Sequence, residues 1–396
     1  QTELDLLRPF HRAIPLVGRD ADMASLWQWL HSERQISVRT VTGRAGAGKT
    51  RIAVDLMKRL GDERARAWHA GFVTELEMTR FARQQNLSAW GWRLPTLIVL
   101  DYAGAYLAAL WPWLHELALT PRGDERPPLR LLLLERQASL EEGWYRGLQD
   151  ASHSGAGVAR LFDPLAPVPL QPLDTAAHRR EVLGEMLKKG APFFKTAAPP
   201  VPPEGQDPCF DRVLADDQWA DPLYLMMAAL VSLQHGLVVA LALSRKDLAM
   251  RLASREEERL RRYAGDPRSP AAGLLAHMAG YVTLCGGLTK QDALQAAREE
   301  CDTFVVEYPN GPGVLVDKLR EAMPGAPYLA PLKPDIIGEA SILRALGGPK
   351  RDLGTGAVLR AARRAGTAVA AAVLRAAQDF SYAEPARGAQ YRARPQ

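Results

Sequence analysis

An eight-residue run rich in glycine constrains this chain more than any other feature. Residues 43–50 read Gly-Arg-Ala-Gly-Ala-Gly-Lys-Thr, which matches the phosphate-binding pattern G-x-x-x-x-G-K-[ST] at every required position. Small residues let successive backbone N–H groups turn inward around phosphate oxygens, and a helix that begins near Lys49 adds the positive end of its dipole. The pattern predicts that Lys49 contacts the outer phosphates and that the Thr50 hydroxyl binds Mg²⁺.

The residues on either side of this run fit a strand–loop–helix unit better than an ordinary glycine-rich turn. Before the loop, residues that favour a strand alternate along the chain, namely Ile36, Val38 and Thr40. After the loop, apolar residues recur at helical spacing, namely Ile52, Leu56 and Leu60. Gly61 is expected to cap the carboxyl end of that helix.

Alternating strand and helix signals over residues 1–165 predict a parallel sheet with crossover helices. Further strands are expected at residues 67–73, 97–101 and 129–134. The apolar strand at 97–101 ends in Asp101, and the carboxyl end of such a strand is where a second ligand for Mg²⁺ belongs.

The residues that would position a water molecule for hydrolysis are less clear. Residue 102 is Tyr, whereas enzymes that hydrolyse ATP rapidly often place a second carboxylate directly after this strand. Glu135 and Asp163 are alternatives between which the sequence does not decide, so slow hydrolysis is expected. Arg136 follows the strand at 129–134 and could contact the γ-phosphate through its bidentate guanidinium; otherwise it is a solvated loop residue.

Length and composition predict a soluble chain of two to four domains. The chain has 396 residues, of which 47% are hydrophobic and 24% charged. No apolar run approaches the ~20 residues needed to cross a membrane. The three cysteines have no metal-ligand spacing and are interpreted as reduced thiols of a cytoplasmic protein. The start at Gln1 indicates a segment of something longer.

Charge along the chain argues against a nucleic-acid partner. The net charge is +5, but residues 350–396 alone carry nine Lys/Arg against three acidic residues. Residues 266–345 carry seven Lys/Arg against ten Asp/Glu, whereas a phosphate-neutralising surface needs the opposite balance. The basic character therefore belongs to a C-terminal tail.

In their order along the chain, these motifs resemble the STAND class of signal-transduction ATPases, which is related to NACHT and NB-ARC modules within the wider AAA+ group. Leu16-Val17-Gly18-Arg19-Asp20 looks like the class motif that borders the adenine. Arg136 matches its first sensor, and Ala220-Asp221-Pro222-Leu223 stands where the class has Gly-x-Pro. Residues 333–339 stand where the winged-helix domain of the class has a Met-His-Asp motif. In this chain Pro334 replaces the His of that motif, and Asp335 is kept.

The resemblance implies an α/β P-loop NTPase domain with a parallel sheet and flanking helices, followed by a helical domain and a winged-helix domain. The expected segments are 1–165 (nucleotide binding), 166–265 (helical, with a Pro-rich insertion at 190–208), 266–345 (winged helix) and 346–396 (the helical start of a sensor region and a flexible basic tail). The residues expected to act in catalysis are Lys49, Asp101 and Arg136, with Thr50 and Asp101 on Mg²⁺. Those expected to bind ATP or ADP are Val17, Gly18, Arg19, Gly43, Ala45, Gly46, Ala47, Gly48, Lys49, Thr50, Arg51, Pro222 and Asp335.

By the same resemblance, the chain is expected to be a slow ATPase that acts as a switch. It would be closed with ADP and would open with ATP to assemble with copies of itself, in antiphage defence or regulation. An effector would precede it, and a downstream sensor would receive an unknown activating ligand. Two other functions stay open: a DNA-binding AAA+-type ATPase that uses the winged helix, and, less favoured, a metabolic P-loop kinase.

Overall fold

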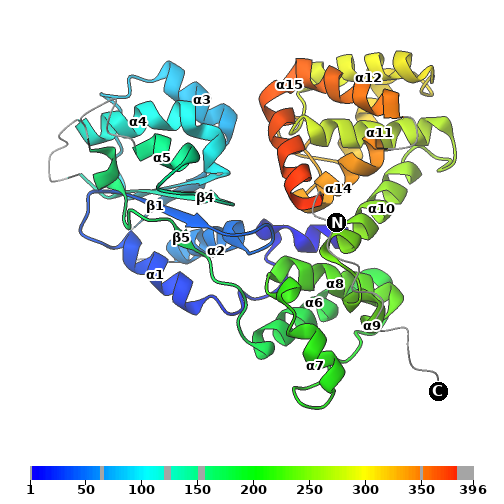
Figure 1. Ribbon diagram of the computed structural model, residues 1–396. Helices are drawn as coiled ribbons and strands as arrows, with labels where there is room; N and C mark the ends of the chain where they lie inside the picture. The colour runs from blue at the N-terminus through cyan, green and yellow to red at the C-terminus, as the bar shows by residue number, and fades with distance from the viewer. Residues whose placement is uncertain (1, 63–66, 120–125, 150–156, 348–350, 381–396) are drawn as a thin grey trace. The chain divides into compact units, whose positions relative to one another are not determined.

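The chain folds into two compact units (Figure 1). The computed structural model describes residues 2–62, 67–119, 126–149, 157–347 and 351–380. The P-loop unit comprises residues 14–185 and 202–225, and the helical unit comprises the described parts of 1–13, 186–201 and 226–396. The segment expected at 166–265 is divided between the two units. The division into four successive segments therefore remains a proposal.

The P-loop unit alternates helices and strands along most of its length. Its elements are α1 (Asp20–Leu30), β1 (Ile36–Thr42), α2 (Lys49–Asp62), β2 (His69–Phe72), α3 (Glu75–Gln84), β3 (Thr96–Asp101), η3 (Ala103–Tyr106), α4 (Leu107–Leu119), β4 (Leu129–Glu135), α5 (Gly143–Gln149), η5 (Val158–Leu161), β5 (Val168–Pro169), α7 (Pro208–Leu214) and η6 (Asp217–Trp219). The strands expected from the sequence are therefore present. Gly61 lies inside α2 and lacks the positive φ of a cap, so its expected capping role is wrong.

The five strands form one parallel sheet in the order β2-β3-β4-β1-β5. β4 therefore lies between the strand that enters the loop and the strand that ends in Asp101. In register, Thr42 is opposite Glu135, and Asp101 is opposite Leu134. The loop, Glu135 and Asp101 consequently meet at the carboxyl edge of the sheet, which is the edge where ligands bind in such folds.

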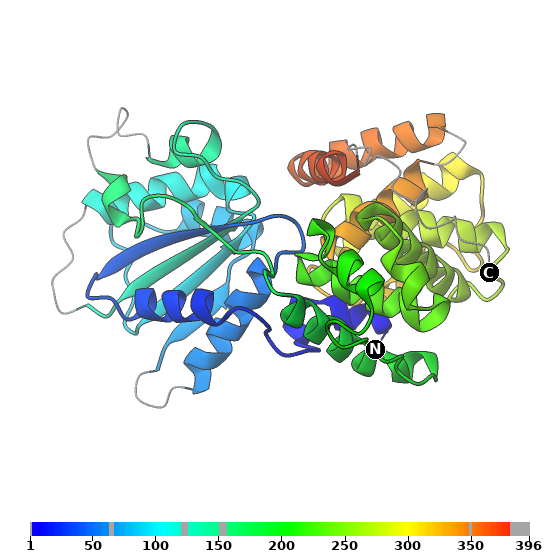
Figure 2. The ribbon, with the colours of Figure 1, turned by 60° about the horizontal axis from the view of Figure 1, so that its bottom comes forward.

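Strand residues alternate between two cores, one on each face of the sheet. Leu97, Val99, Leu132 and Leu134 pack with residues of α1 and α2, whereas Leu100, Leu129, Leu131 and Leu133 pack with α4, α5 and η5. Figure 2 shows these helices on opposite sides of the sheet. The P-loop unit is thus a three-layer α/β sandwich. Its aromatic cluster at Phe81, Trp90 and Trp113 belongs to the second core and forms no exposed stacking platform.

Arg130 interrupts the apolar strand β4 and is fully buried. Its guanidinium donates to the carbonyl oxygens of Trp29, Leu30 and Ser32, at the end of α1, over 2.8–3.2 Å. Burial lowers the pKa of Arg130 to about 10. These bonds supply donors to carbonyls that a helix end leaves without partners, so Arg130 ties α1 to the sheet.

The helical unit contains η1 (Glu3–Leu7), η2 (Pro9–His11), α9 (Leu237–Leu241), α10 (Arg245–Arg262), α11 (Pro270–Leu284), α12 (Lys290–Phe304), α13 (Pro312–Ala322), α14 (Asp335–Leu346) and α15 (Arg351–Phe380). Two helices, α6 (Ala176–Phe194) and α8 (Pro222–His235), begin in the P-loop unit and end in the helical unit. Because α6 runs to Phe194, the Pro-rich insertion begins later than the expected residue 190.

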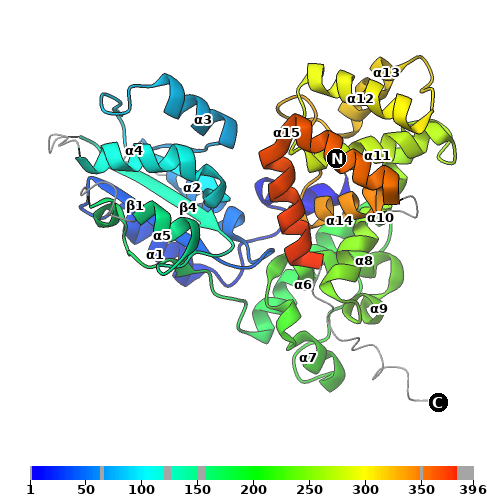
Figure 3. The same cartoon turned by 45° about the horizontal axis from the view of Figure 1, so that its top comes forward.

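The region after α10 has the order of elements of a winged helix. Leu329 bridges in antiparallel fashion both to Leu288, between α11 and α12, and to Pro324, after α13. The helices share one apolar core, and Figure 3 shows α15 beside α11 and α14. The chain is therefore an α/β P-loop NTPase fold followed by helical and winged-helix regions, as the sequence predicts.

The remaining sequence expectations have mixed outcomes. The helix expected at 356–378 is present within α15, with a kink at Ala365. The basic tail from residue 381 lies outside the described residues. Cys285 and Cys301 are buried free thiols, whereas Cys209 is exposed. Among the helices that the structure describes, none combines the length and the apolar character that crossing a bilayer requires.

Candidate nucleotide-binding site

The loop at 43–48 wraps around the amino end of α2. Gly46 and Gly48 have φ values of 84° and 100°, which residues with a side chain rarely adopt. A Cβ atom on Gly48 would have nothing within 4 Å, so this side of the loop is open. The open side and the free N–H groups at the start of α2 form a cradle that suits phosphate oxygens.

Lys49 lies over this loop. Its Nζ donates to the carbonyl oxygens of Gly43 at 2.5 Å and Arg44 at 3.1 Å. Burial lowers the pKa of Lys49; Asp101 opposes this shift, while the charge of Arg136 adds to it. A partly desolvated ammonium beside an open cradle gains stabilisation from an anion, so a phosphate group fits here.

Thr50 and Asp101 meet at the same edge. The Thr50 hydroxyl donates to Asp101 Oδ2 at 2.7 Å, which brings together the two oxygen groups expected on Mg²⁺. Among the described residues, no cluster of three or more His, Cys, Asp or Glu could hold a metal by itself. That donor set fits Mg²⁺, which is usually held by one or two carboxylates together with substrate phosphates and water.

The strand order separates the two candidates for orienting water. Glu135 lies at the ligand edge, between the loop and Asp101. Asp163 instead donates its backbone N–H to Val38 O and pairs with Arg34 at 3.4 Å, roughly 16 Å back along β1 from the loop. Of the two, only Glu135 is near the site.

Glu135 and Tyr102 shape the loops after their strands. Glu135 accepts from the backbone N–H of Gly104 at 2.9 Å and of Arg136 at 2.7 Å. Tyr102 has a left-handed backbone (φ 59°) and donates its N–H to Asp101 Oδ1 at 3.1 Å. A non-glycine residue in this conformation is uncommon and is found more often at functional sites. The carboxylate of Glu135 thus already has two backbone donors.

The residues before α1 support the loop from behind. Gly18 has φ 62°, and a Cβ there would lie 2.9 Å from His178 Nδ1, so this position requires glycine. The buried Arg19 donates to Ala47 O at 2.9 Å and to Gln171 O. Val17 is buried as well. The Arg19 guanidinium thus holds the loop in place, while the expected nucleotide contact at residues 17–19 remains a prediction.

The start of α8 also contacts the loop, which the sequence did not reveal. Leu223 N donates to Gly46 O at 3.3 Å, next to Pro222 at the first position of the helix. Arg44 reaches Asp217 at 2.8 Å. These partners are more than 170 residues apart in sequence, and no local pattern links them.

Two other expected site residues have partners of their own. Arg51 Nη2 donates to Ile14 O at 2.8 Å, and its Nε contacts Asp55. Asp335 begins α14 in the helical unit and contacts Lys333. The nucleotide roles of both residues remain predictions, as does that of Ala45 in the loop.

A single methyl group tests how tightly the loop is held. Gly46→Ala should lower the free energy of unfolding by about 1–2 kcal/mol, because φ is 84° and the new Cβ would lie 3.1 Å from Leu223 Cβ and from the Tyr224 ring. Thermal unfolding measures this. The matched control Gly61→Ala, in a helix with open space, should stabilise by about 0.5–1 kcal/mol. Equal shifts for the two variants would contradict the described loop geometry.

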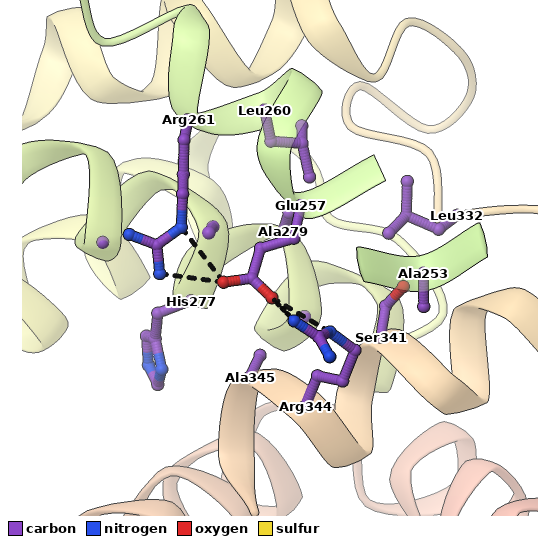
Figure 4. Close-up of a pocket in the computed structure, with 13 residues that line it drawn as sticks. Ala253, Glu257, Leu260, Arg261, His277, Ala279, Leu332, Ser341, Arg344 and Ala345 are labelled. Carbon is purple, nitrogen blue, oxygen red and sulfur yellow. Dashed lines mark hydrogen bonds and ion pairs between the residues drawn. The ribbon is translucent and has the colours of Figure 1, made fainter. Parts of the chain in front are cut away.

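The helical unit has a pocket of about 100 Å³ (Figure 4). At its wall, Glu257 accepts from Arg261 and Arg344 through its two carboxylate oxygens, at 2.8–3.0 Å. This shared carboxylate joins α10 to α14 and satisfies both guanidinium groups in part. The arrangement explains the packing of these two helices.

No protein-family model matches the chain, and no curated protein matches it. Solved structures show low similarity. The replication initiator DnaA bound to AMPPCP and single-stranded DNA has a TM-score of 0.36 and 11% identity, over 80% of this chain and 91% of that one. Cdc6p from Pyrobaculum aerophilum has a TM-score of 0.36 and 14% identity, over 86% and 97%. NtrX from Brucella abortus in complex with ADP has 0.35 and 15%, over 81% and 72%. The fold assignment rests on the strands, loop and helices of this chain.

Proposed function

We propose that the chain is a nucleotide-dependent switch of the STAND type. It binds ATP or ADP with Mg²⁺ at residues 43–50, hydrolyses ATP slowly, and changes the arrangement of its two units with the nucleotide bound. The ATP form assembles with further copies of the chain. An upstream effector and a downstream sensor with its activating ligand, in antiphage defence or regulation, complete the proposal by resemblance.

The cradle supports nucleotide binding by its chemistry. The open loop, the half-buried Lys49 and the Thr50–Asp101 pair place N–H donors, an ammonium group and two hard oxygen ligands at one edge of the sheet. When bound, Mg²⁺ would be held by Thr50 and Asp101 and would neutralise charge on the phosphates. Arg136 follows β4 at the same edge, and its charge adds to the lowering of the Lys49 pKa, which supports its expected contact with a terminal phosphate.

One observation carries the switch: the loop bonds directly to a helix that leaves the P-loop unit. Gly46 O accepts from Leu223 N, and α8 continues past Leu225 into the helical unit. A change of loop conformation on phosphate binding therefore acts at the first turn of a helix shared by both units. A nucleotide switch needs a connection of this kind between the phosphate site and the part of the chain that responds.

Slow hydrolysis follows from what surrounds the phosphate position. Tyr102 supplies no carboxylate, and Glu135 already accepts two backbone hydrogen bonds. Both bonds hold the Glu135 carboxylate against the backbone after β3 and β4, so its oxygens are already engaged where a water molecule would need them. Pro334 has no imidazole to hold ADP, so the closed state needs another group; Asp335, beside it, contacts Lys333.

Arg136→Ala tests whether the γ-phosphate is sensed. ADP affinity should be unchanged, whereas ATP affinity should fall about tenfold or more, because a charge-assisted bond to the γ-phosphate is lost. Calorimetric titration with Mg-ADP and Mg-AMPPCP measures both. The exposed Arg93 offers a control with the same substitution and should change neither affinity. Wild-type affinity for AMPPCP in Arg136→Ala would remove the sensor role.

Hydrogen exchange separates the switch from its alternatives. Amides of the helical unit should exchange differently in ADP-loaded and AMPPCP-loaded protein; identical patterns at saturation would contradict a switch. Salt-dependent DNA binding with DNA-stimulated turnover would instead support the DNA-binding ATPase. The acidic balance of residues 266–345 argues against that outcome.

A further inference from the structure

Arg44, the second residue of the loop, reaches across to the segment before α8. Its Nη1 lies 2.8 Å from Asp217 Oδ2, its Nη2 lies 3.4 Å from Asp217 Oδ1, and its Nε lies 3.4 Å from Asp221 Oδ2. The hydrogen bond to Asp217 raises the pKa of Arg44, which therefore stays charged. One guanidinium thus joins the phosphate-binding loop to two carboxylates.

The two carboxylates differ in their exposure. The side chain of Asp217 is 74% exposed and that of Asp221 is 3% exposed. Water and salt screen the first pair strongly and the second much less. Asp221 also opposes the lowering of the pKa values of Arg19 and Lys49, so its negative charge interacts with these two cations as well as with Arg44.

Asp221 thus places a negative charge beside the position predicted for nucleotide phosphates. A polyphosphate bound at Lys49 would be repelled by this carboxylate and attracted by the Arg44 guanidinium. The phosphate and the two carboxylates therefore compete for one cation. Guanidinium binds carboxylate and phosphate oxygens in the same bidentate way, and a polyphosphate carries more negative charge than either carboxylate, so bound nucleotide can displace Asp217 and Asp221 from Arg44.

The contact lies where it can affect α8. Asp221 directly precedes the helix, and Tyr224 N donates to Asp221 O at 3.2 Å. Leu223 N donates to Gly46 O on the other side of the same turn. Releasing Arg44 from Asp217 and Asp221 would remove the ionic part of the connection between the loop and the helix start and leave the Leu223–Gly46 backbone bond in place.

We propose that Arg44, Asp217 and Asp221 form a charge latch between the phosphate-binding loop and the start of α8, which nucleotide phosphate opens by competing for Arg44. The latch rests on the proposed function, since it requires nucleotide at residues 43–50. It adds a specific device by which phosphate charge reaches the helix shared by both units. By linkage, a change that weakens the latch at Asp217 or Asp221 and leaves Arg44 in place must tighten nucleotide binding.

A double-mutant cycle on the full chain tests the latch. Asp217→Asn should bind Mg-ATP about two- to fivefold more tightly than wild type, as expected for an exposed ion pair. Asp221→Asn should tighten binding about tenfold, because its carboxylate is buried. In an Arg44→Ala background, Asp217→Asn should have no effect, because its partner is gone. Calorimetric titration at two salt concentrations measures these changes, and the Asp217→Asn effect should shrink at high salt.

Matched controls separate the latch from general charge effects. Glu181→Gln removes an exposed negative charge from the same unit and should leave Mg-ATP affinity unchanged. Hydrogen exchange at the amide of Leu223 should be faster in nucleotide-free Asp217→Asn than in nucleotide-free wild type, and Mg-ATP should accelerate it in wild type.

The outcomes distinguish this proposal from the one on which it rests. Wild-type protein that binds ATP, with Asp217→Asn binding equally well or the same shift in both backgrounds, would overturn the latch alone. Wild-type protein that binds no nucleotide would remove the proposed function and the latch together. Asp217 is a surface residue, so its variant is expected to fold.

Discussion

Replacing Lys49 by Met should weaken the binding of both ATP and ADP about 100-fold, since charge-assisted bonds to phosphate are lost from a half-buried position. The expectation follows from the position of the Nζ group, which contacts the carbonyls of Gly43 and Arg44 and has a further donor for phosphate. Met keeps the length and apolar stem of the side chain, so the loop should keep its packing. Calorimetric titration with each nucleotide gives the affinities.

Lys58→Met provides the control for this experiment. Lys58 lies on the exposed side of α2, the helix that begins with Lys49, and receives the same substitution. Its nucleotide affinity and unfolding temperature should match those of wild type. Lys49→Met protein that unfolds normally yet binds ATP with wild-type affinity would disprove the assignment of the loop.

Asp101→Asn should abolish the contribution of Mg²⁺ to ATP affinity and reduce hydrolysis about 100-fold. The carboxylate accepts the Thr50 hydroxyl at 2.7 Å and supplies the negative charge that a divalent cation requires at this edge. The effect of Asp101→Asn on ATP affinity should therefore have opposite signs with and without Mg²⁺. In EDTA, the variant should bind ATP as tightly as wild type or more tightly, because a negative charge near the phosphates has been removed.

Three further variants test the interpretation of the metal site. Thr50→Val removes the hydroxyl at nearly constant shape and should lose Mg²⁺ dependence, whereas Thr50→Ser should keep it. Asp62→Asn changes an exposed carboxylate on α2 and should behave as wild type. If Mg²⁺ improved ATP binding of Asp101→Asn as much as it improves that of wild type, the proposed ligand set would be wrong.

Local sequence patterns were sufficient to predict the local structure at the centre of the candidate site. The strand, the loop and the start of α2 are contiguous, and Asp101 ends a strand whose apolar run is visible in the sequence. Such features depend on neighbours within a few residues. The expectation that Gly61 caps α2 is wrong for a related reason. A glycine marks a helix end only where its backbone takes a positive φ, and the residue type alone does not reveal φ.

Features that depend on strand order or distant partners could not be predicted. Glu135 and Asp163 are equivalent in sequence, and only the insertion of β4 between β1 and β3 places Glu135 at the site. Arg130 sits within an apparent leucine strand, and its burial depends on carbonyls at the end of α1. The pairing of Arg44 with Asp217 requires the chain to return to the loop after many intervening elements.

The back of the phosphate-binding loop is completed by residues 202–225, which come long after the sheet has ended. A fragment cut near residue 165 would retain Gly43 to Thr50. It would lack Leu223 and Tyr224, which contact Gly46 in the full chain. The smallest autonomous nucleotide binder should therefore extend to about Leu225. Its two stretches are joined through residues 186–201, so isolating it requires shortening that connection as well as ending the chain near Leu225.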